Sequence, residues 1–227
     1  MALNIHTITL PFPFGMGRVN CYLLTAETGF VLVDTGAASN RKALTSELDA
    51  AGCQPGKLNL IVLTHGDYDH TGNAVYLRQR LGAKIAMHPD DAGMLEQGDM
   101  FFNRKKPNAV LAALLPIFGG FGKAERGNPD VLLREGDNLA GYGLDARVIS
   151  IPGHSKGSIG ILLASGDLFC GDLLVSTKSP GLNSLIDDMP AAQASLQKLA
   201  GMQVGTVYPG HGDPFPLQQI ITASASG

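Results

Sequence analysis

The chain has 227 residues, of which 44% are hydrophobic and 16% charged, and its formal net charge is −3. This length suffices for one sizeable hydrophobic core, and we expect a single domain over residues 1–227. The slightly acidic balance argues against a nucleic acid as the main partner, because proteins that bind polyanions usually carry an excess of basic residues.

No segment has the features of an export signal or a membrane span. Residues 1–20 lack a basic region followed by a long apolar region, and no apolar run approaches the ~20 residues that a membrane helix needs. Cys21, Cys53 and Cys170 form no C-x-x-C pair, so we expect reduced thiols. These features predict a cytoplasmic protein without membrane contact, and they leave the oligomeric state open.

The first third of the chain predicts two strands followed by a helix. Residues 19–25 and 30–33 are short runs of aliphatic and β-branched side chains, separated by a turn-like segment. Residues 40–51 have helical periodicity, with Asn40 as the expected N-cap and Gly52 as the expected stop.

The next segments alternate strand and helix. Residues 58–63 form a near-continuous apolar run, which is typical of a strand buried on both faces. A predicted helix over 73–81 and a predicted strand over 84–87 follow, and this alternation indicates an α/β protein. Residues 90–130 differ, because prolines and glycines interrupt two helix-compatible stretches at 91–96 and 109–118. We expect an insertion there that covers one end of the sheet as a lid.

The second half repeats an order seen in the first. Residues 159–164, a Ser165-Gly166 turn and residues 167–170 lead to Asp172, just as residues 21–34 run through strand, turn and strand to an aspartate. The repeat predicts two similar halves that pack their sheets face to face, with helices outside. Functional residues should gather where strand ends from both halves meet.

Four of the six histidines lie in glycine-containing loops that follow apolar runs, and aspartates share these places. Imidazole nitrogens and carboxylate oxygens are the usual ligands of a divalent metal that keeps an open coordination position. A single Gly-His pair is more often a hydrogen-bonded turn, but histidines from three separate loops indicate a metal centre. The candidate residues are His65, Asp67, Asp69, His70, His154, Asp172 and His211.

The segment 64–72, THGDYDHTG, resembles the T-H-x-H-x-D-H-x-G motif of the metallo-β-lactamase superfamily. The resemblance extends from Cys21 to Gly212, and the LFCGD and YPGHG segments look like the glyoxalase II-like and general hydrolase branches. The family implies an αββα sandwich of two mixed β-sheets flanked by helices, with a binuclear centre in the cleft. Carried over by position, the resemblance puts His65, Asp67 and His154 at the first metal, Asp69, His70 and His211 at the second, and Asp172 between them.

Asp67 stands where the family pattern usually has its second histidine. The resemblance implies two divalent ions, and we expect zinc, with iron or manganese as the alternative at the site containing Asp67, because a carboxylate is a harder ligand than imidazole. A further alternative is that Asp67 reaches the ion through a water or not at all. The second site keeps the full ligand set.

The expected activity is a metal-dependent hydrolase, in which a metal-bound hydroxide cleaves an ester, thioester, lactone or amide bond of a small molecule. Asp69 is the predicted catalytic residue, which orients the nucleophile and relays a proton. Asp34 and Thr64 are predicted to hold the ligand imidazoles, although Asp34 could equally cap its own turn. A non-haem iron oxidoreductase, of dioxygenase or diiron type, is the first alternative, and a phosphodiesterase or nuclease the second.

No motif indicates the residues that bind the substrate. A basic stretch, Arg104 to Lys106 with Lys123 and Arg126, falls in the predicted lid. The simplest interpretation is a solvated face, and the alternative is recognition of an anionic substrate such as a glutathione conjugate.

Overall fold

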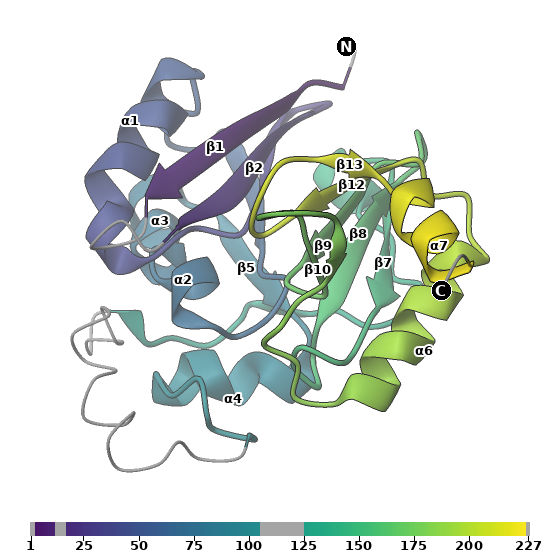
Figure 1. Cartoon of the computed structure of the whole chain (residues 1–227). Helices are drawn as coiled ribbons and strands as arrows, with labels where there is room; N and C mark the ends of the chain where they lie inside the picture. Colours follow the sequence, from purple (N-terminus) through teal and green to yellow (C-terminus); the bar gives the residue numbers. More distant parts are fainter. Residues whose placement is uncertain (1–2, 12–16, 105–124, 226–227) are drawn as a thin grey trace.

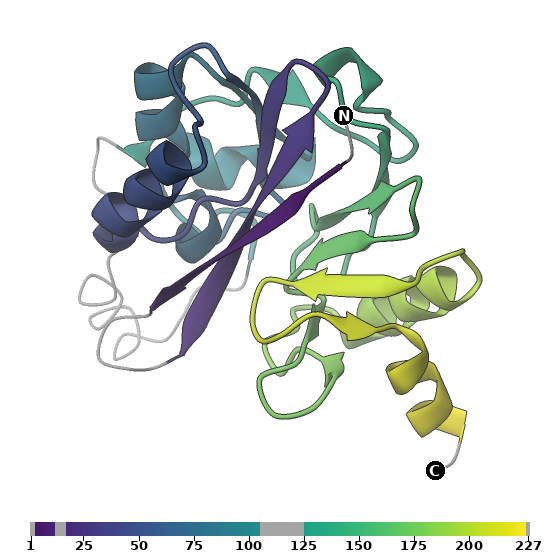
Figure 2. The ribbon, with the colours of Figure 1, turned by 90° about the horizontal axis from the view of Figure 1, so that it is seen from above.

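The computed structural model describes residues 3–11, 17–104 and 125–225. Two β-sheets face each other, and helices cover the outer face of each sheet (Figure 1, Figure 2). The strands of the first sheet run antiparallel from β1 to β3 and parallel from β3 to β6. In spatial order they are β1 (Ile5–Pro11), β2 (Arg18–Ala26), β3 (Gly29–Val33), β4 (Leu58–Val62), β5 (Lys84–Met87) and β6 (Val131–Leu132).

The second sheet is also mixed, because β9 and β12 pair in parallel while its other neighbours are antiparallel. A separate antiparallel pair, β10 (Leu174–Val175) with β11 (Gly181–Leu182), follows β9. In spatial order the strands of the second sheet are β13 (Phe215–Pro216), β12 (Thr206–Pro209), β9 (Leu168–Gly171), β8 (Ile159–Leu163) and β7 (Ala146–Ser150).

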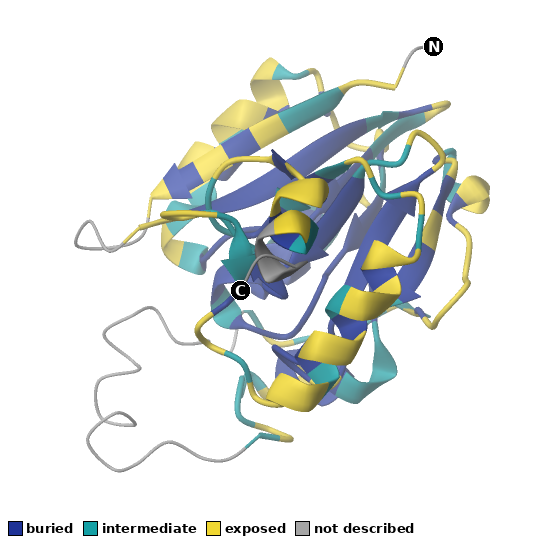
Figure 3. Ribbon diagram, turned by 45° about the vertical axis from the view of Figure 1, so that its right-hand side comes forward, coloured by how far each residue is buried: buried dark blue, intermediate teal, exposed yellow. Residues whose placement is uncertain are grey.

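Three hydrophobic clusters define the layers. One packs helices α1 and α3 against the first sheet, one fills the space between the sheets, and one packs α6 and α7 against the second sheet. Figure 3 shows the inner strands buried between exposed helix surfaces, whereas the edge strand β1 is partly exposed. The helices are α1 (Arg41–Ala50), α2 (Tyr68–Thr71), α3 (Ala74–Leu81), α4 (Pro89–Gln97), α6 (Met189–Ala200) and α7 (Gln218–Ala225), with 3-10 turns at Ala38–Asn40 and Ala140–Tyr142. The predicted αββα sandwich of two mixed sheets is confirmed.

The hydrophobic patterns located most elements of the first half. The strands expected at 19–25, 30–33, 58–63 and 84–87 are β2 to β5, and the expected helices are α1 and α3. The internal repeat corresponds to the antiparallel pairs β2–β3 and β8–β9. The stretch 91–96 lies inside α4, whereas 109–118 falls outside the described residues, so the lid stays a prediction. Within the described residues, no helix is long and apolar enough to cross a membrane.

Candidate metal centre

The predicted metal ligands lie in four segments, each of which follows a strand, and two of them, Asp69 and His70, lie in the short helix α2. His65, Asp67, Asp69 and His70 come after β4, and the other three follow β7, β9 and β12. The loop after β4 belongs to the first sheet and the others to the second, so the centre forms where strand ends of both halves meet. The residues in the last three loops are His154, Asp172 and His211.

Six of the seven predicted ligands converge in two groups. His65, His154 and Asp172 form what we term the first-site group, and Asp69, His70 and His211 form the second-site group. Within each group the potential ligand atoms lie within 4.8 Å of one another.

Asp172 faces both groups. Its Oδ1 lies 3.3 Å from His70 Nε2, and its Oδ2 lies 3.2 Å from His211 Nε2. The imidazoles form a row, with ring centroids 4.7 Å apart for His154 and His65 and 4.2 Å apart for His65 and His70. Asp172 therefore occupies the position between the groups that the predicted bridging role requires, and that role stays a prediction.

The four ligand imidazoles are held through Nδ1. Because a carbonyl or carboxylate oxygen only accepts, and the Thr64 hydroxyl already donates to Asp34, Nδ1 must donate in each case, so that in the neutral imidazole the lone pair is on Nε2, which faces the centre. This is the tautomer that binds a metal through Nε2. The Nδ1 partners are Thr64 Oγ1 at 2.9 Å for His65, Asp34 Oδ2 at 2.8 Å for His70, the Leu185 carbonyl at 2.5 Å for His154 and the Arg18 carbonyl at 2.6 Å for His211.

The atoms that face the centre fit a divalent cation. Nε2 of His65, Nε2 of His70 and Oδ1 of Asp172 are buried, and they make no hydrogen bond within the described part of the chain. Buried polar atoms without partners are costly and call for a ligand or an ion. Imidazole nitrogens with carboxylate oxygens suit zinc, iron or manganese. The residues present therefore fit the implied metal centre.

Asp34 holds imidazoles from both groups. Its Oδ2 accepts hydrogen bonds from His70 Nδ1 and, at 2.8 Å, from Thr64 Oγ1, which in turn accepts from His65. Its Oδ1 accepts from the Thr64 backbone amide at 2.9 Å. Among the described residues, this carboxylate makes no bond to its own turn at Thr35-Gly36. The contacts match the predicted supporting role of Asp34 and Thr64, which itself stays a prediction.

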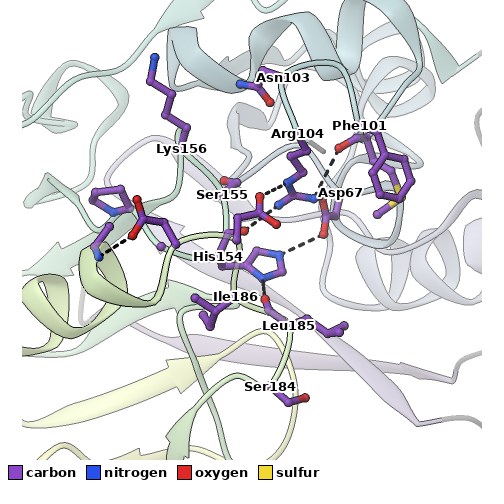
Figure 4. Close-up of a pocket in the computed structure, with 16 residues that line it drawn as sticks. Asp67, Phe101, Asn103, Arg104, His154, Ser155, Lys156, Ser184, Leu185 and Ile186 are labelled. Atoms are coloured by element: carbon purple, nitrogen blue, oxygen red, sulfur yellow. Dashed lines mark hydrogen bonds and ion pairs between the residues drawn. The ribbon is translucent and has the colours of Figure 1, made fainter. Parts of the chain in front are cut away.

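Asp67 stands outside both groups, although it touches the first. Its Oδ2 lies 3.0 Å from His154 Nε2 and 3.7 Å from His65 Nε2, while its Oδ1 pairs with Arg104 Nη1 (Figure 4). Burial raises the pKa of this carboxyl, but the hydrogen bond from His154 and the charges of His65 and Arg104 outweigh it and lower the pKa to about 2. Asp67 is therefore an ionised carboxylate shared between an arginine and the first-site imidazoles.

Arg104 is the residue that sequence reasoning missed. Its side chain is only 8% exposed, so the interpretation of a solvated basic face is wrong for this position. Its Nη2 donates to the His154 carbonyl at 3.1 Å, and its Nε lies 2.6 Å from Asp187 Oδ2. The only sequence signal was the unusual carboxylate at Asp67, which in a buried site calls for a cation.

The second-site group is strongly charged. Burial lowers the pKa of His211, but the Asp172 charge and the hydrogen bonds to Asp172 and Asp69 outweigh it and raise the pKa to about 10. Burial likewise opposes protonation of His70, yet the carboxylates of Asp69, Asp172 and Asp34 raise its pKa. Without a metal, protons therefore take the place of a cation between these carboxylates, and a metal must displace them.

A cavity of about 800 Å³ opens beside the first-site group, and Asp67 and His154 form part of its wall (Figure 4). The remaining wall comes from the segment after α4, the loop around His154, and the loop that precedes α6. Its apolar side chains are Met100, Phe101, Pro152, Leu185, Ile186 and Ala191.

Comparison with known proteins agrees with this geometry. The chain is 26% identical to a probable metallo-hydrolase, YqjP, from Bacillus subtilis (strain 168), over 96% of this chain and 74% of that protein. It is 33% identical to the hydroxyacylglutathione hydrolase of Cupriavidus taiwanensis, over 68% of this chain but only half the length of that enzyme.

Two solved structures have the same fold. The metallo-beta-lactamase family protein TTHA1429 from Thermus thermophilus gives a TM-score of 0.72 at 27% identity, over 98% of this chain and 78% of that one. TTHA1623, solved in a di-iron-bound form, gives a TM-score of 0.69 at 28% identity, over 92% of this chain and 96% of that one. Residues 14–211 match the family described as the metallo-beta-lactamase superfamily. With its fold, its strand-end histidines and this match, the chain belongs to the metallo-β-lactamase superfamily.

Proposed function

We propose that the chain is a hydrolase with two metal positions that cleaves an ester, thioester, lactone or amide bond of a small molecule. The observation that carries this proposal is the arrangement of the two ligand groups around Asp172, beside a cavity of about 800 Å³. Divalent ions bound there would supply a nucleophile from water near neutral pH and would polarise the scissile carbonyl. The relatives named as a metallo-hydrolase and a hydroxyacylglutathione hydrolase support the same reaction class.

The chain's own residues would orient the reactants. Asp69 Oδ2 lies 3.4 Å from both His70 Nε2 and His211 Nε2, so this carboxylate faces the centre. Burial raises its pKa, but the charge of His70 and the hydrogen bond from His211 outweigh burial and lower it. An ionised Asp69 can accept a hydrogen bond from the attacking water and receive its proton.

The cavity indicates what the rest of the substrate looks like. Met100 and Phe101 lie on one wall and Leu185 and Ile186 on another, and Leu185 is 72% exposed. Apolar walls beside a reactive centre favour an apolar acyl or aryl group. Arg104 is already paired with two carboxylates, Asp67 and Asp187, so it adds little attraction for an anionic substrate.

A panel of generic thioester, lactone, β-lactam and phosphodiester substrates tests the proposal, with elemental analysis of protein purified without added metal. We expect hydrolysis of an acyl substrate, at rates that increase with acyl chain length, and loss of that activity in Asp69→Asn. No turnover of any acyl substrate by the metal-loaded protein would contradict the proposal.

One observation favours a second function, a non-haem iron oxidoreductase. Asp67 gives the first-site region an extra carboxylate, and TTHA1623 is a similar structure in a di-iron-bound form. Near-stoichiometric iron in the purified protein, together with oxygen consumption and no hydrolysis, would favour this reaction.

A further inference from the structure

Helix α4 places a carboxylate in the interior of the molecule. Asp91 has 0% exposure, and within the described residues it forms no ion pair. An isolated buried carboxylate is very costly unless hydrogen bonds satisfy its oxygens. The partners of Asp91 therefore show what it does in the fold.

Asp91 accepts three hydrogen bonds from the two loops that carry the first-site histidines. The Gly66 amide donates to Oδ2 at 3.1 Å, and Ser155 Oγ donates to the same oxygen at 2.6 Å. The Gly157 amide donates to Oδ1 at 2.8 Å. Gly66 is adjacent to His65 and to Asp67, and Ser155 is adjacent to His154, so one side chain joins both loops beside their ligands.

Both glycines are needed for this approach. A Cβ on Gly66 would lie 2.3 Å from Met94 Sδ, and a Cβ on Gly157 would lie 2.5 Å from Asp91 Oδ1. Real Cβ atoms essentially never come so close to other atoms, so any side chain at either position would push α4 away. The glycines of the two loops therefore allow α4 to pack closely enough for Asp91 to reach both loops.

We propose that Asp91 is a positioning residue for the first metal position: it fixes the distance between His65 and His154. The inference rests on the metal centre of the proposed function. Its hydrogen bonds reach groups directly next to His65 and His154, whereas the Nδ1 atoms of His70 and His211 are held by Asp34 and by the Arg18 carbonyl. Loss of Asp91 should therefore affect the two metal positions unequally.

Asp91→Asn tests this role with little change in size. The asparagine side chain keeps one acceptor oxygen, but a donor NH2 group replaces the other oxygen. That NH2 group would face another donor, either a backbone N–H or the Ser155 hydroxyl. Supporting groups of this kind typically contribute about 10- to 100-fold to metal affinity. In Asp91→Asn we expect the affinity for one equivalent of metal to fall by about 10- to 100-fold, and the affinity for the other to change by less than about 3-fold. Titrations followed by calorimetry and by cobalt(II) absorption measure both affinities. His154→Ala and His211→Ala identify the two equivalents.

Asp90→Asn is the matched control. Asp90 is the preceding residue of the same helix, and its partly exposed carboxylate lies 3.5 Å from Lys156 Nζ. The substitution changes a carboxylate of the same helix and removes its ion pairs to the side chains of Lys156 and His88, while the three hydrogen bonds of Asp91 to the two loops remain. We expect both metal equivalents to bind as in the wild-type protein.

Ser155→Ala keeps the proposal testable if Asp91→Asn fails to fold, because it removes one of the three hydrogen bonds. It should weaken the same equivalent of metal as Asp91→Asn, by a smaller factor. Unchanged binding of both equivalents in Asp91→Asn, or equal weakening of both in Ser155→Ala, would overturn the proposal. A wild-type protein that binds metal but hydrolyses no substrate would contradict the proposed function, while these titrations would still decide the role of Asp91.

Discussion

At the scale of single residues, Asp67 stands where the family usually has a histidine, and Arg104 pairs with this carboxylate. A carboxylate adds one negative charge to the first site, and the guanidinium restores the charge that a neutral histidine would give. The pair is buried, and breaking a buried ion pair by changing one partner typically costs a protein about 3–5 kcal/mol, less where a second partner such as Asp187 remains.

Asp67→His should therefore behave differently alone and together with Arg104→Gln. Alone, it leaves Arg104 beside a neutral imidazole, with Asp187 as the carboxylate that remains near its guanidinium. We expect the double variant to bind zinc at the first site about 10-fold or more tightly than the single variant, measured by competition with a chromophoric chelator. Equal zinc affinity in the two variants would show that Arg104 does not act through Asp67. A metal preference unchanged from the wild type in the double variant would show that Asp67 is no ligand.

Asp172→Ala should lower the occupancy of both metal positions, because Asp172 belongs to the first-site group and its two oxygens also lie 3.3 and 3.2 Å from the second-site imidazoles of His70 and His211. Elemental analysis after dialysis against metal-free buffer measures the effect, and we expect well under one ion per chain. Asp167→Ala is a suitable control, since that carboxylate accepts from Ser165 Oγ in the exposed turn between β8 and β9. Two ions retained in Asp172→Ala would count against the bridging role.

At the scale of elements, the loop that precedes α6 supports several first-site residues at once. Asn183 donates to Asp172 Oδ2 at 3.3 Å, the Leu185 carbonyl holds His154, and Asp187 pairs with Arg104. The loop ends at Asp188, whose Oδ1 caps α6 by accepting from the Ala191 amide at 3.0 Å. The helix cap thus fixes one end of a segment that lines both the centre and the cavity.

Asp188→Ala should lower the free energy of unfolding by about 0.5–2 kcal/mol, the usual cost of losing an N-cap. Chemical denaturation of the metal-loaded protein measures this, and Asp188→Ser should recover most of the loss because serine also caps helices well. A full loss in both variants would mean that Asp188 acts through something other than the cap.

Sequence patterns predicted the elements that carry local signals and missed contacts between distant segments. The apolar runs marked β2 to β5, and the histidine-bearing loops marked the metal centre. Arg104 and Asp91 were missed because each acts on a loop 25 or more residues away in sequence. Arg104 begins a basic stretch that has the composition of a solvated surface, and Asp91 lies in an ordinary acidic first turn of a helix. The partners of Arg104 and Asp91 lie in distant segments, and these segments meet only when the chain has folded.

At the scale of the whole molecule, the centre joins the two halves of the sandwich. The first and second groups each combine residues that follow β4, in the first sheet, with residues that follow strands of the second sheet. A bound ion therefore crosslinks elements that otherwise meet through the hydrophobic cluster between the sheets. Stability should depend on metal as well as on packing.

Removal of metal should lower the melting temperature. An ion present at 100 times its Kd contributes about 2.7 kcal/mol, and for a chain of this size each kcal/mol corresponds to roughly 2–4 °C. We expect a decrease of about 5–10 °C on exhaustive chelation, reversed by added zinc, in differential scanning calorimetry. An unchanged melting temperature, with metal loss verified by elemental analysis, would contradict the crosslinking role.

The oxygen Oδ2 of Asp34 links the two ligand groups in a further way. It accepts a hydrogen bond from His70 directly, and it is connected to His65 through the hydroxyl of Thr64. A cation on His70 would strengthen the Nδ1 donor there, and Asp34 Oδ2 would then be a weaker acceptor for the hydroxyl of Thr64, which holds His65. The two binding constants should therefore depend on each other slightly, with an ion bound at one group weakening the support of the imidazole in the other group.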